Sequence, residues 1–369
     1  MGDSAPDLNA IASRFDLPAA VTTITPLGNG NVNDTYRVDT ATGTCFVLQR
    51  LNTAVFPQPE LVMANLLALA RHVKAKGDQA GCQVPSPVPL LNGGECLLRQ
   101  PDGSAWRLLT FIAGTHSLDV LENGEQAEQV GRGLGRFHAL VHDLPGNQLH
   151  DTLEGFHVTP RYLERYQDVL TNSAVPPCPE SEACQLIVEQ RLDLVPVLEN
   201  ARQAGCLQLR PIHGDPKVNN VMLCQTSGRA VALVDLDTVK PGLLHYDIGD
   251  CLRSACNPAG EECTDLEAVH FNLELAEALL RGYLAEAGSC LSAADLDHLY
   301  DAIRLLPFEL GLRFFTDHLA GNVYFKASHA RQNLVRARVQ FRLTESIEDQ
   351  EPALRALIAR LTSSNELLP

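Results

Sequence analysis

Residues 212–220 read I-H-G-D-P-K-V-N-N, and residues 231–237 read V-A-L-V-D-L-D. The first stretch is polar, as expected of a loop, and presents Asp215 and Asn220, whereas the second is an apolar strand that delivers Asp235. A carboxylate beside an acceptor hydroxyl, together with two oxygen ligands for magnesium, is what phosphoryl transfer requires. The two stretches therefore favour a divided phosphoryl-transfer site around which the rest of the chain folds.

The length and charge of the chain restrict its class. With 369 residues it is too long for one comfortable core, so we expect two lobes, at 1–113 and 114–369. The formal charge of −16 argues against nucleic acid or a membrane as partner, because phosphate groups bind clustered Lys and Arg. No apolar run approaches the ~20 residues that span a bilayer, and the N-terminus does not resemble a signal peptide. We expect a cytoplasmic protein with no obligate protein partner.

The spacing of Cys and His residues does not indicate a metal site. The 11 cysteines include no C-x-x-C pair, which favours reduced, buried thiols over disulfides or zinc. His138 and His142 lie four residues apart, but no third ligand is near, so ordinary buried or surface histidines are favoured.

Residues 21–113 predict a small, mainly antiparallel lobe with one amphipathic helix at 59–76. A Gly/Asn turn between its first strands contains Gly28 and Gly30. These glycines would let the backbone approach a nucleotide closely, although an ordinary hairpin turn has the same composition.

The same lobe has few candidates for binding the phosphates and the base of a nucleotide. Strand alternation places Gln49 and Arg50 on opposite faces, and Arg50 is the candidate phosphate cation, with a solvated strand residue as the alternative. The segment 109–114 is the expected crossing between lobes, where the backbone of Thr110 and Ile112 would pair with an adenine edge.

The second lobe is predicted to be mainly helical. Apolar residues recur at intervals of three and four, and Pro196 is expected to kink or divide one helix. The expected helices are 126–142, 161–170, 182–203, 266–284, 291–312 and 331–343.

The pattern H-G-D-x-x-x-x-N, followed by an apolar strand ending in D-x-D, resembles the aminoglycoside phosphotransferase and choline kinase-like superfamily, a relative of the protein kinases. The resemblance implies an α+β, two-lobed, protein-kinase-like fold with a small antiparallel-sheet N-lobe and a larger, mainly helical C-lobe. Within it the chain is most similar to bacterial N-acetylhexosamine 1-kinases, which phosphorylate the anomeric hydroxyl of GlcNAc or GalNAc. The segments that carry this are N-V-N-D-T-Y-R-V, F-V-L-Q-R-L-N-T-A-V-F, G-F-H-V-T-P-R-Y-L, V-D-L-D-T-V-K-P-G and L-R-F-F-T-D-H-L-A-G-N-V-Y-F-K.

The resemblance implies roles for the opening motifs. Asp215 matches the catalytic base, and Asn220 and Asp235 match the ligands of Mg²⁺ beside the phosphates of ATP. Lys217, two residues after the base, would either touch the γ-phosphate or remain solvated.

Three further residues would support this centre. His213 is expected to brace the loop that carries the base, and Asp247 is expected to hold the same loop. Asp237 would be a supporting or an additional metal ligand.

The acceptor is the part of the site that the motifs specify least. The resemblance implies sugar contacts from Arg313 and Tyr324, with Asn33 also facing the ligands, while the alternative for Arg313 is a surface ion pair with Asp317. Two departures from the family's pattern weaken these assignments. Asn322 stands where an Asp is expected, and no clear lysine occupies the small lobe's phosphate position.

Other functions remain open on these residues. In one alternative, the acceptor is another alcohol, such as choline, homoserine, methylthioribose or an aminoglycoside. A choline site needs an aromatic cage, and aromatics are only 5% of the chain. A non-catalytic nucleotide- or sugar-binding relative is disfavoured because Asp215, Asn220 and Asp235 are all present. A hydrolase would need a nucleophile and oxyanion donors, which we do not find.

Overall fold

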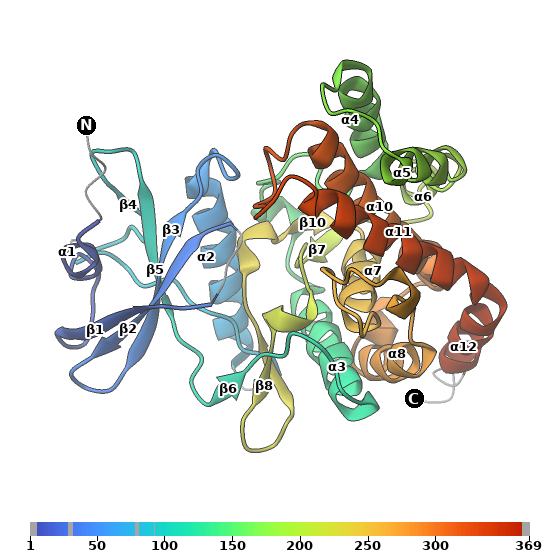
Figure 1. The fold of residues 1–369 in the computed structure, drawn as a ribbon. Helices are drawn as coiled ribbons and strands as arrows, with labels where there is room; N and C mark the ends of the chain where they lie inside the picture. The colour runs from blue at the N-terminus through green and yellow to red at the C-terminus, as the bar shows by residue number, and fades with distance from the viewer. Residues whose placement is uncertain (1–5, 29–31, 78–80, 92, 364–369) are drawn as a thin grey trace.

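The computed structural model of this chain describes residues 6–28, 32–77, 81–91 and 93–363. A small N-terminal lobe built on a sheet lies beside a larger, mainly helical C-terminal lobe (Figure 1). The two-lobed α+β arrangement predicted from the sequence is confirmed. Among the described helices, none combines the length and the apolar character needed to cross a membrane.

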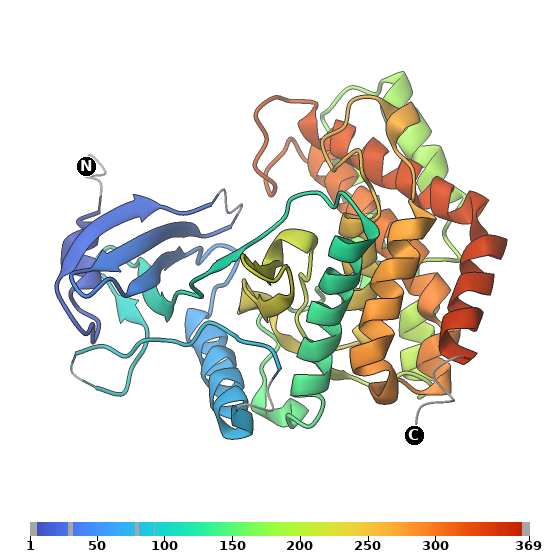
Figure 2. The ribbon, with the colours of Figure 1, turned by 90° about the horizontal axis from the view of Figure 1, so that it is seen from below.

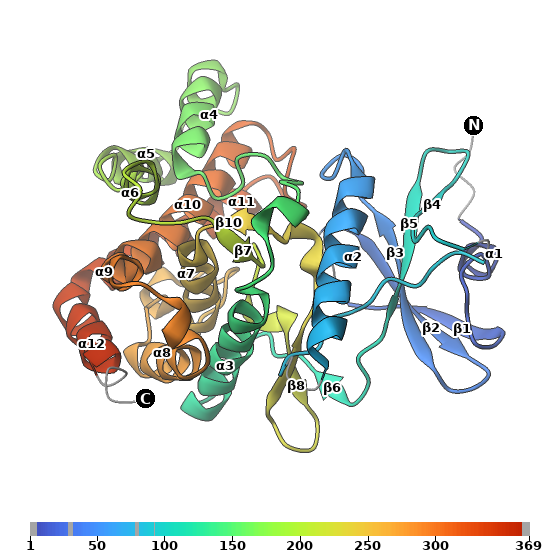
Figure 3. The ribbon, with the colours of Figure 1, turned by 180° about the vertical axis from the view of Figure 1, so that it is seen from behind.

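The small lobe is an antiparallel five-stranded sheet with strand order β1-β2-β3-β5-β4. Helix α2 lies between this sheet and the C-terminal lobe (Figure 1, Figure 3), where it contacts α3. The elements are α1 (Leu8–Ala12), β1 (Val21–Pro26), β2 (Asp34–Thr40), β3 (Cys45–Leu51), α2 (Pro59–Lys76), β4 (Leu98–Arg99) and β5 (Ala105–Thr110).

The two faces of the sheet differ because alternate strand residues point to opposite sides. Phe46 of β3 and Trp106 of β5 belong to a small apolar core that includes α1. Gln49 of β3 and Arg107 of β5 are cross-strand partners on the other face, which meets the C-terminal lobe, where Arg107 contacts Asp237. This alternation decides which cation of the small lobe reaches the other lobe.

The C-terminal lobe packs helices around two short antiparallel sheets, β6-β8-β9 and β10-β7. Figure 2 shows α3 and α8 side by side. The strands are β6 (Thr115–His116), β7 (Arg210–Ile212), β8 (Val221–Cys224), β9 (Ala230–Leu233) and β10 (Lys240–Gly242). The helices are α3 (Gly124–Val141), α4 (Thr159–Asn172), α5 (Pro179–Glu189), α6 (Val197–Gln203), α7 (Leu244–Ala255), α8 (Leu273–Ala287), α9 (Ala293–Asp297), α10 (Leu299–Leu319), α11 (Gln332–Asp349) and α12 (Glu351–Ser363).

Several helix boundaries differ from the prediction. The helix expected over 182–203 is divided into α5 and α6, as Pro196 indicated. The helix expected over 266–284 begins only at Leu273, because the side chain of Asn272 caps it there. Helices α9 and α10 replace one predicted helix, α11 extends beyond its predicted end, and α12 was not predicted.

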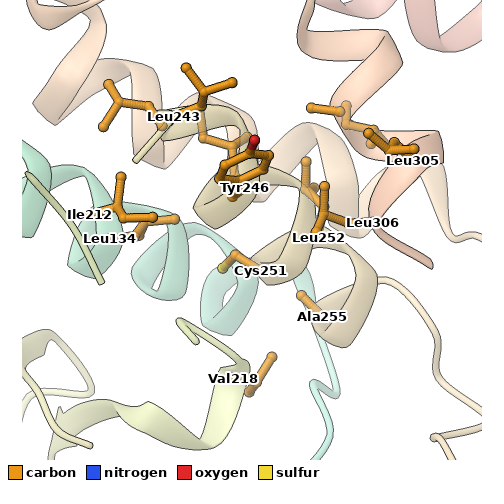
Figure 4. Close-up of a cluster of buried hydrophobic side chains, with 14 of the residues drawn as sticks. Leu134, Ile212, Val218, Leu243, Tyr246, Cys251, Leu252, Ala255, Leu305 and Leu306 are labelled. Atoms are coloured by element: carbon orange, nitrogen blue, oxygen red, sulfur yellow. The ribbon is translucent and has the colours of Figure 1, made fainter. Parts of the chain in front are cut away.

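A close-packed apolar core supports the middle of the C-terminal lobe (Figure 4). Helix α7 contributes Leu252 and Cys251, which lie among Leu134 of α3 and Leu306 of α10. Interiors of this kind compress little, because they are packed as densely as organic crystals. Helix α7 is therefore a rigid support for the polar residues at its N-terminal end.

Cysteines and histidines are mostly ordinary structural residues here. All 11 cysteines are free, as expected of reduced thiols, but only five of them are buried. His138 is buried and binds the Tyr283 hydroxyl at 2.8 Å and the Asp247 carboxylate at 2.9 Å. The interpretation of His138 as a buried histidine is confirmed.

Two glycines permit the close crossing of α3 and α8. A Cβ atom at Gly131 would lie 2.0 Å from the carbonyl oxygen of Leu279, and one at Gly282 would lie 2.2 Å from that of Glu128. Both distances are far below van der Waals contact with backbone that has little room to shift. The helices lie this close only because both positions lack a side chain.

We expect Gly282→Ala to separate the two helices and to lower the free energy of unfolding by about 1–3 kcal/mol or more, the range for overpacked cores. Urea unfolding measures this. The matched control is Gly146→Ala, because nothing lies within 4 Å of a Cβ built there. Equal stability of the two variants would contradict the close crossing.

Candidate active site

The loop at 213–220, called the catalytic loop below, connects β7 and β8. The buried carboxylate of Asp247, on α7, accepts hydrogen bonds from the backbone N–H of His213 at 2.7 Å and from that of Gly214 at 2.8 Å. Bonds from N–H groups to an ionised acceptor are stronger than neutral ones. The backbone is thereby fixed immediately before Asp215.

His213 connects the catalytic loop to the end of β9. Its Nε2 lies 3.0 Å from the carbonyl oxygen of Val234, and its Nδ1 accepts the backbone N–H of Asp215 at 3.3 Å. Burial lowers the pKa of His213. Both contacts suit a neutral ring with the proton on Nε2.

Asp215, Lys217 and Asn220 lie together on the catalytic loop. Lys217 Nζ is 3.1 Å from Asp215 Oδ2, and this carboxylate is the first cause of the raised pKa of the lysine. Asn220 Nδ2 donates to the backbone carbonyl of Asp215 at 2.8 Å, which leaves the amide oxygen of Asn220 as the group able to bind a cation. Asp215 is partly exposed and lines a pocket of about 390 Å³.

Asp235 and Asp237 lie on the turn that follows β9. Asp235 has a left-handed backbone, with φ 62° and ψ 55°, a conformation that is rare outside Gly, Asn and Asp. Crowding by protein atoms, followed by the charges of Asp237 and Asp215, raises the pKa of Asp235 to about 6, although solvent still reaches its side chain. Asp237 is buried.

This donor set fits a magnesium ion. Mg²⁺ is commonly held by one or two carboxylates and completed by substrate phosphates and water, and the Asp235 carboxylate with the Asn220 amide oxygen provides ligands of that type. Asp237 and Asp215 add negative charge beside Asp235, which a divalent cation would offset. In the described residues, no group of three or more His, Cys, Asp or Glu side chains is arranged to hold a metal.

The structure corrects one of the nucleotide-binding predictions. Arg50 is exposed and shares its sheet face with Phe46, away from the C-terminal lobe, so it is the solvated strand residue of the alternative interpretation. Gly28 has φ +69°, and a Cβ there would touch nothing within 4 Å. Gly30 lies outside the described residues.

The predicted adenine-binding segment crosses between the lobes with two of its groups already bonded. The N–H of Thr110 donates to the carbonyl of Ser86 at 2.9 Å, and the carbonyl of Ile112 accepts from the Thr115 hydroxyl at 2.7 Å. A contact with adenine remains a prediction, and it would use other backbone groups of this segment.

The prediction that Asn33 contacts the acceptor is also corrected. Asn33 is buried, its Nδ2 donates to Asp237 Oδ2 at 2.7 Å, and its Oδ1 accepts from the N–H of Asn52 at 3.0 Å. Its amide is therefore used between the lobes. Arg107, which also contacts Asp237, was not identified from the sequence, although the alternation that selects Gln49 applies equally to β5.

Arg313, on α10, lies in a box of aromatic rings at the main pocket. Its guanidinium carbon is 5.1 Å from the ring centre of Phe156, 5.0 Å from that of Tyr162 and 5.5 Å from that of Phe325. Within the described part of the chain, no hydrogen-bond acceptor or carboxylate is paired with Arg313. The guanidinium is thus stacked by protein but free to bind a ligand in the pocket.

Asp317 does not pair with Arg313, so the surface ion pair is excluded. Its carboxylate accepts from the backbone N–H groups of Val323, Tyr324 and Phe325 at 2.8–3.0 Å. These bonds hold the segment 322–325 against the pocket, which Tyr324 lines.

The Asn that replaces the expected Asp has a structural explanation. Asn322 has φ +61°, a left-handed conformation that Asn adopts more easily than most residues. Its amide bonds Ala330 and Asn333. Asn322 therefore forms the turn that presents the pocket segment.

His157 is a site residue that sequence reasoning missed. It is buried with φ +64°, and its ring bonds the Glu309 carboxylate and the Gly214 carbonyl, each at 2.8 Å. Because both partners only accept, an imidazolium that donates twice fits the site. Burial alone would lower the pKa of His157, but the Glu309 carboxylate and then Asp250 outweigh it, and the net pKa is raised.

A known family model matches most of the chain, and known structures match nearly all of it. Residues 23–294 match the model of the phosphotransferase enzyme family. A microcompartment-associated aminopropanol kinase superposes with a TM-score of 0.65 at 18% identity, covering 95% of this chain and 98% of that one. Amicoumacin kinase hAmiN, solved with AMP-PNP and Ca²⁺, superposes with a TM-score of 0.60 at 17% identity, covering 93% of this chain and 92% of that one. Choline kinase from Cryptosporidium parvum superposes with a TM-score of 0.58 at 14% identity, covering 92% of each chain. The protein-kinase-like fold is thereby confirmed.

The pair of His157 and Glu309 makes stability depend on pH. A folded-state pKa above the unfolded value of about 6.5 means that the stabilisation is complete below pH ~6.5 and is lost as the pH rises through the folded pKa. In urea unfolding, we expect the free energy of unfolding of Glu309→Gln to fall furthest below that of the unchanged protein at low pH. This difference in free energy should narrow toward pH 9. The control Glu154→Gln changes a carboxylate on an exposed pair and should show no such difference. A difference that stays constant with pH would contradict the charged pair.

Proposed function

Since the chain belongs to the phosphotransferase enzyme family and is a small-molecule alcohol kinase, we propose that it phosphorylates the anomeric hydroxyl of an N-acetylhexosamine, GlcNAc or GalNAc, with ATP and Mg²⁺. The products would be the sugar 1-phosphate and ADP. The observation that carries the proposal is that Asp215 lines the same pocket as Arg313, whose guanidinium has no paired acceptor among the described residues.

Asp215 is the group placed to act on the acceptor. Its carboxylate opens into the pocket, so it would accept the proton of the anomeric hydroxyl, or orient its oxygen for in-line attack on the γ-phosphorus. Lys217, held cationic beside it, would offset negative charge as the phosphoryl group approaches. Asn220 and Asp235 would hold Mg²⁺, which would supply positive charge against the nucleotide phosphates.

Arg313 would recognise the acetamido group. A guanidinium with no protein acceptor leaves its N–H groups available for the acetamido carbonyl, and a buried polar group that loses its partner is costly, so such a contact discriminates strongly. The surrounding rings, and Tyr324 on the rim, would pack against the apolar parts of the sugar. The volume of about 390 Å³ is in the range of small-ligand sites.

The same arginine disfavours a cationic acceptor. An ammonium compound such as choline or aminopropanol would seek an aromatic cage, but here Arg313 itself occupies the aromatic box. Among nearby carboxylates, Glu309 is bonded to His157 and Thr159, and Asp250 is paired with Arg253. A cationic acceptor beside Arg313 would therefore meet the repulsion of the guanidinium, and the two buried carboxylates nearest to it are already paired.

We expect ADP release with Mg-ATP and GlcNAc or GalNAc, and a product whose phosphorus NMR signal couples to the anomeric proton. Asp215→Asn should lose about 10²- to 10⁴-fold in kcat, the usual size of a general-base contribution, while still binding ADP. Choline, aminopropanol, homoserine, methylthioribose and an aminoglycoside complete the acceptor panel. Turnover with one of these and none with either hexosamine would overturn the proposal.

We expect Arg313→Met to raise KM for the hexosamine about 10- to 100-fold, since a hydrogen bond to a charged group contributes about 1.5–3 kcal/mol. KM for ATP should stay nearly unchanged. The control is Arg71→Met, which removes an exposed arginine of α2. Steady-state kinetics with each substrate varied in turn distinguish the two parameters, and a rise confined to the KM of ATP would contradict the assignment.

A further inference from the structure

The small lobe of a phosphoryl-transfer enzyme usually contributes a cation to the phosphate and metal centre, and here the expected lysine is missing. Arg50, the candidate from the sequence, points away from the other lobe. Arg107 lies on the opposite face of the sheet and is one of the most deeply buried side chains of the described residues, with 1% of its surface exposed. Its surroundings show what it does instead.

Arg107 is fixed on both sides. Its Nη2 lies 2.5 Å from Asp237 Oδ1 in the other lobe. Within its own lobe, its Nε and Nη2 donate to Gln49 Oε1 at 2.9 Å and 2.7 Å, and Gln49 Nε2 in turn donates to the Thr35 hydroxyl at 3.0 Å. A planar guanidinium presents its donors in a rigid fork, so it contacts both partners in a fixed geometry, whereas an ammonium is a point charge on a flexible stem.

Asp237 collects bonds from separate segments of the small lobe. Arg107 comes from β5, and Asn33, which binds the second carboxylate oxygen at 2.7 Å, precedes β2. Asp237 is 3% exposed. Because a buried charge is stable only when it is paired and hydrogen-bonded, Asp237 keeps its place only while the small lobe supplies these donors.

Asp237 lies on the short turn that places the metal-binding carboxylate. The turn spans Leu236–Thr238, and Asp235 precedes it in the left-handed conformation, which persists only where the surroundings impose it. The next residue, Thr238, donates through Oγ1 to the carbonyl of His213 at 2.8 Å. Fixing Asp237 therefore fixes Asp235 on one side and the catalytic loop on the other.

We propose that Arg107 is a positioning residue that acts through Asp237 to hold Asp235 in the geometry for Mg²⁺-nucleotide, in place of the small-lobe lysine. The inference rests on the proposed use of Mg²⁺ and ATP, but not on the identity of the acceptor. Removing Arg107 should displace Asp235. The variant should therefore lose the extra affinity for nucleotide that magnesium provides. Binding of the metal-free nucleotide should change little.

The test is ADP binding by titration calorimetry, with Mg²⁺ and with EDTA, and no acceptor present. We expect Arg107→Met and Asp237→Asn each to lose about 10- to 100-fold of the magnesium-dependent gain, the usual effect of removing a partner of a metal ligand. The affinity in EDTA should stay within about twofold. The double variant should lose no more than either single one, because residues acting through one interaction are not additive.

Two further variants protect the test against misfolding. Arg107→Lys keeps the positive charge but replaces the rigid fork of donors with one flexible ammonium, so we expect a folded protein with an intermediate loss. Arg50→Met, on the outer face of the same sheet, should bind ADP as the unchanged protein does. Thermal melts of the metal-free proteins report stability separately.

The outcomes separate the two proposals. Variants that melt earlier but keep the full magnesium-dependent gain would show a merely structural ion pair and overturn the inference. An equal loss with and without Mg²⁺ would show direct phosphate contact by Arg107, which also overturns it. Absence of magnesium-dependent ADP binding in the unchanged protein would overturn this inference and the proposed function, whereas failure of both hexosamines as acceptors would overturn only the latter.

Discussion

The geometry of the site depends first on the buried carboxylate of Asp247. It accepts the N–H groups of His213 and Gly214 inside the C-terminal lobe, where an unpaired amide or an unpaired carboxylate would be strongly destabilising. The carboxylate and the two N–H groups satisfy each other's hydrogen-bonding needs, so the backbone of the catalytic loop is held in one conformation at this point. Helix α7, seated in the apolar core, supplies the rigidity behind it.

A second buried carboxylate, Asp237, lies on the turn that follows Asp235, but its partners come from the other lobe. The catalytic loop is thus fixed within its own lobe, whereas the metal turn depends on how the lobes meet. One part of the site is thus held within the C-terminal lobe and the other part is held by contacts between the lobes, as we expect if the nucleotide binds between them. Arg107 and Asn33 of the small lobe both contact Asp237 on this turn.

The acceptor side of the site is built from a third set of constraints. The carboxylate of Asp317 accepts hydrogen bonds from the amides of 323–325. Arg313 is stacked by rings and has no paired acceptor among the described residues. His157 connects this wall to the catalytic loop through the Gly214 carbonyl. The pocket wall is therefore hydrogen-bonded to Gly214, the residue before Asp215.

The sequence by itself determined the two-lobed fold and the grouping of Asp215, Asn220 and Asp235, because these three lie on one loop and the adjoining β8–β9 pair, whose geometry is local. It did not determine which residues from distant segments would meet them. Strand alternation separated Gln49 from Arg50. Only the pairing of β3 with β5 and the docking of the lobes decided that the face with Gln49 meets the other lobe and that Arg107 lies on it. The same holds for Glu309 beside His157 and for the rings around Arg313, because contacts between elements far apart in the chain are set by packing and not by spacing.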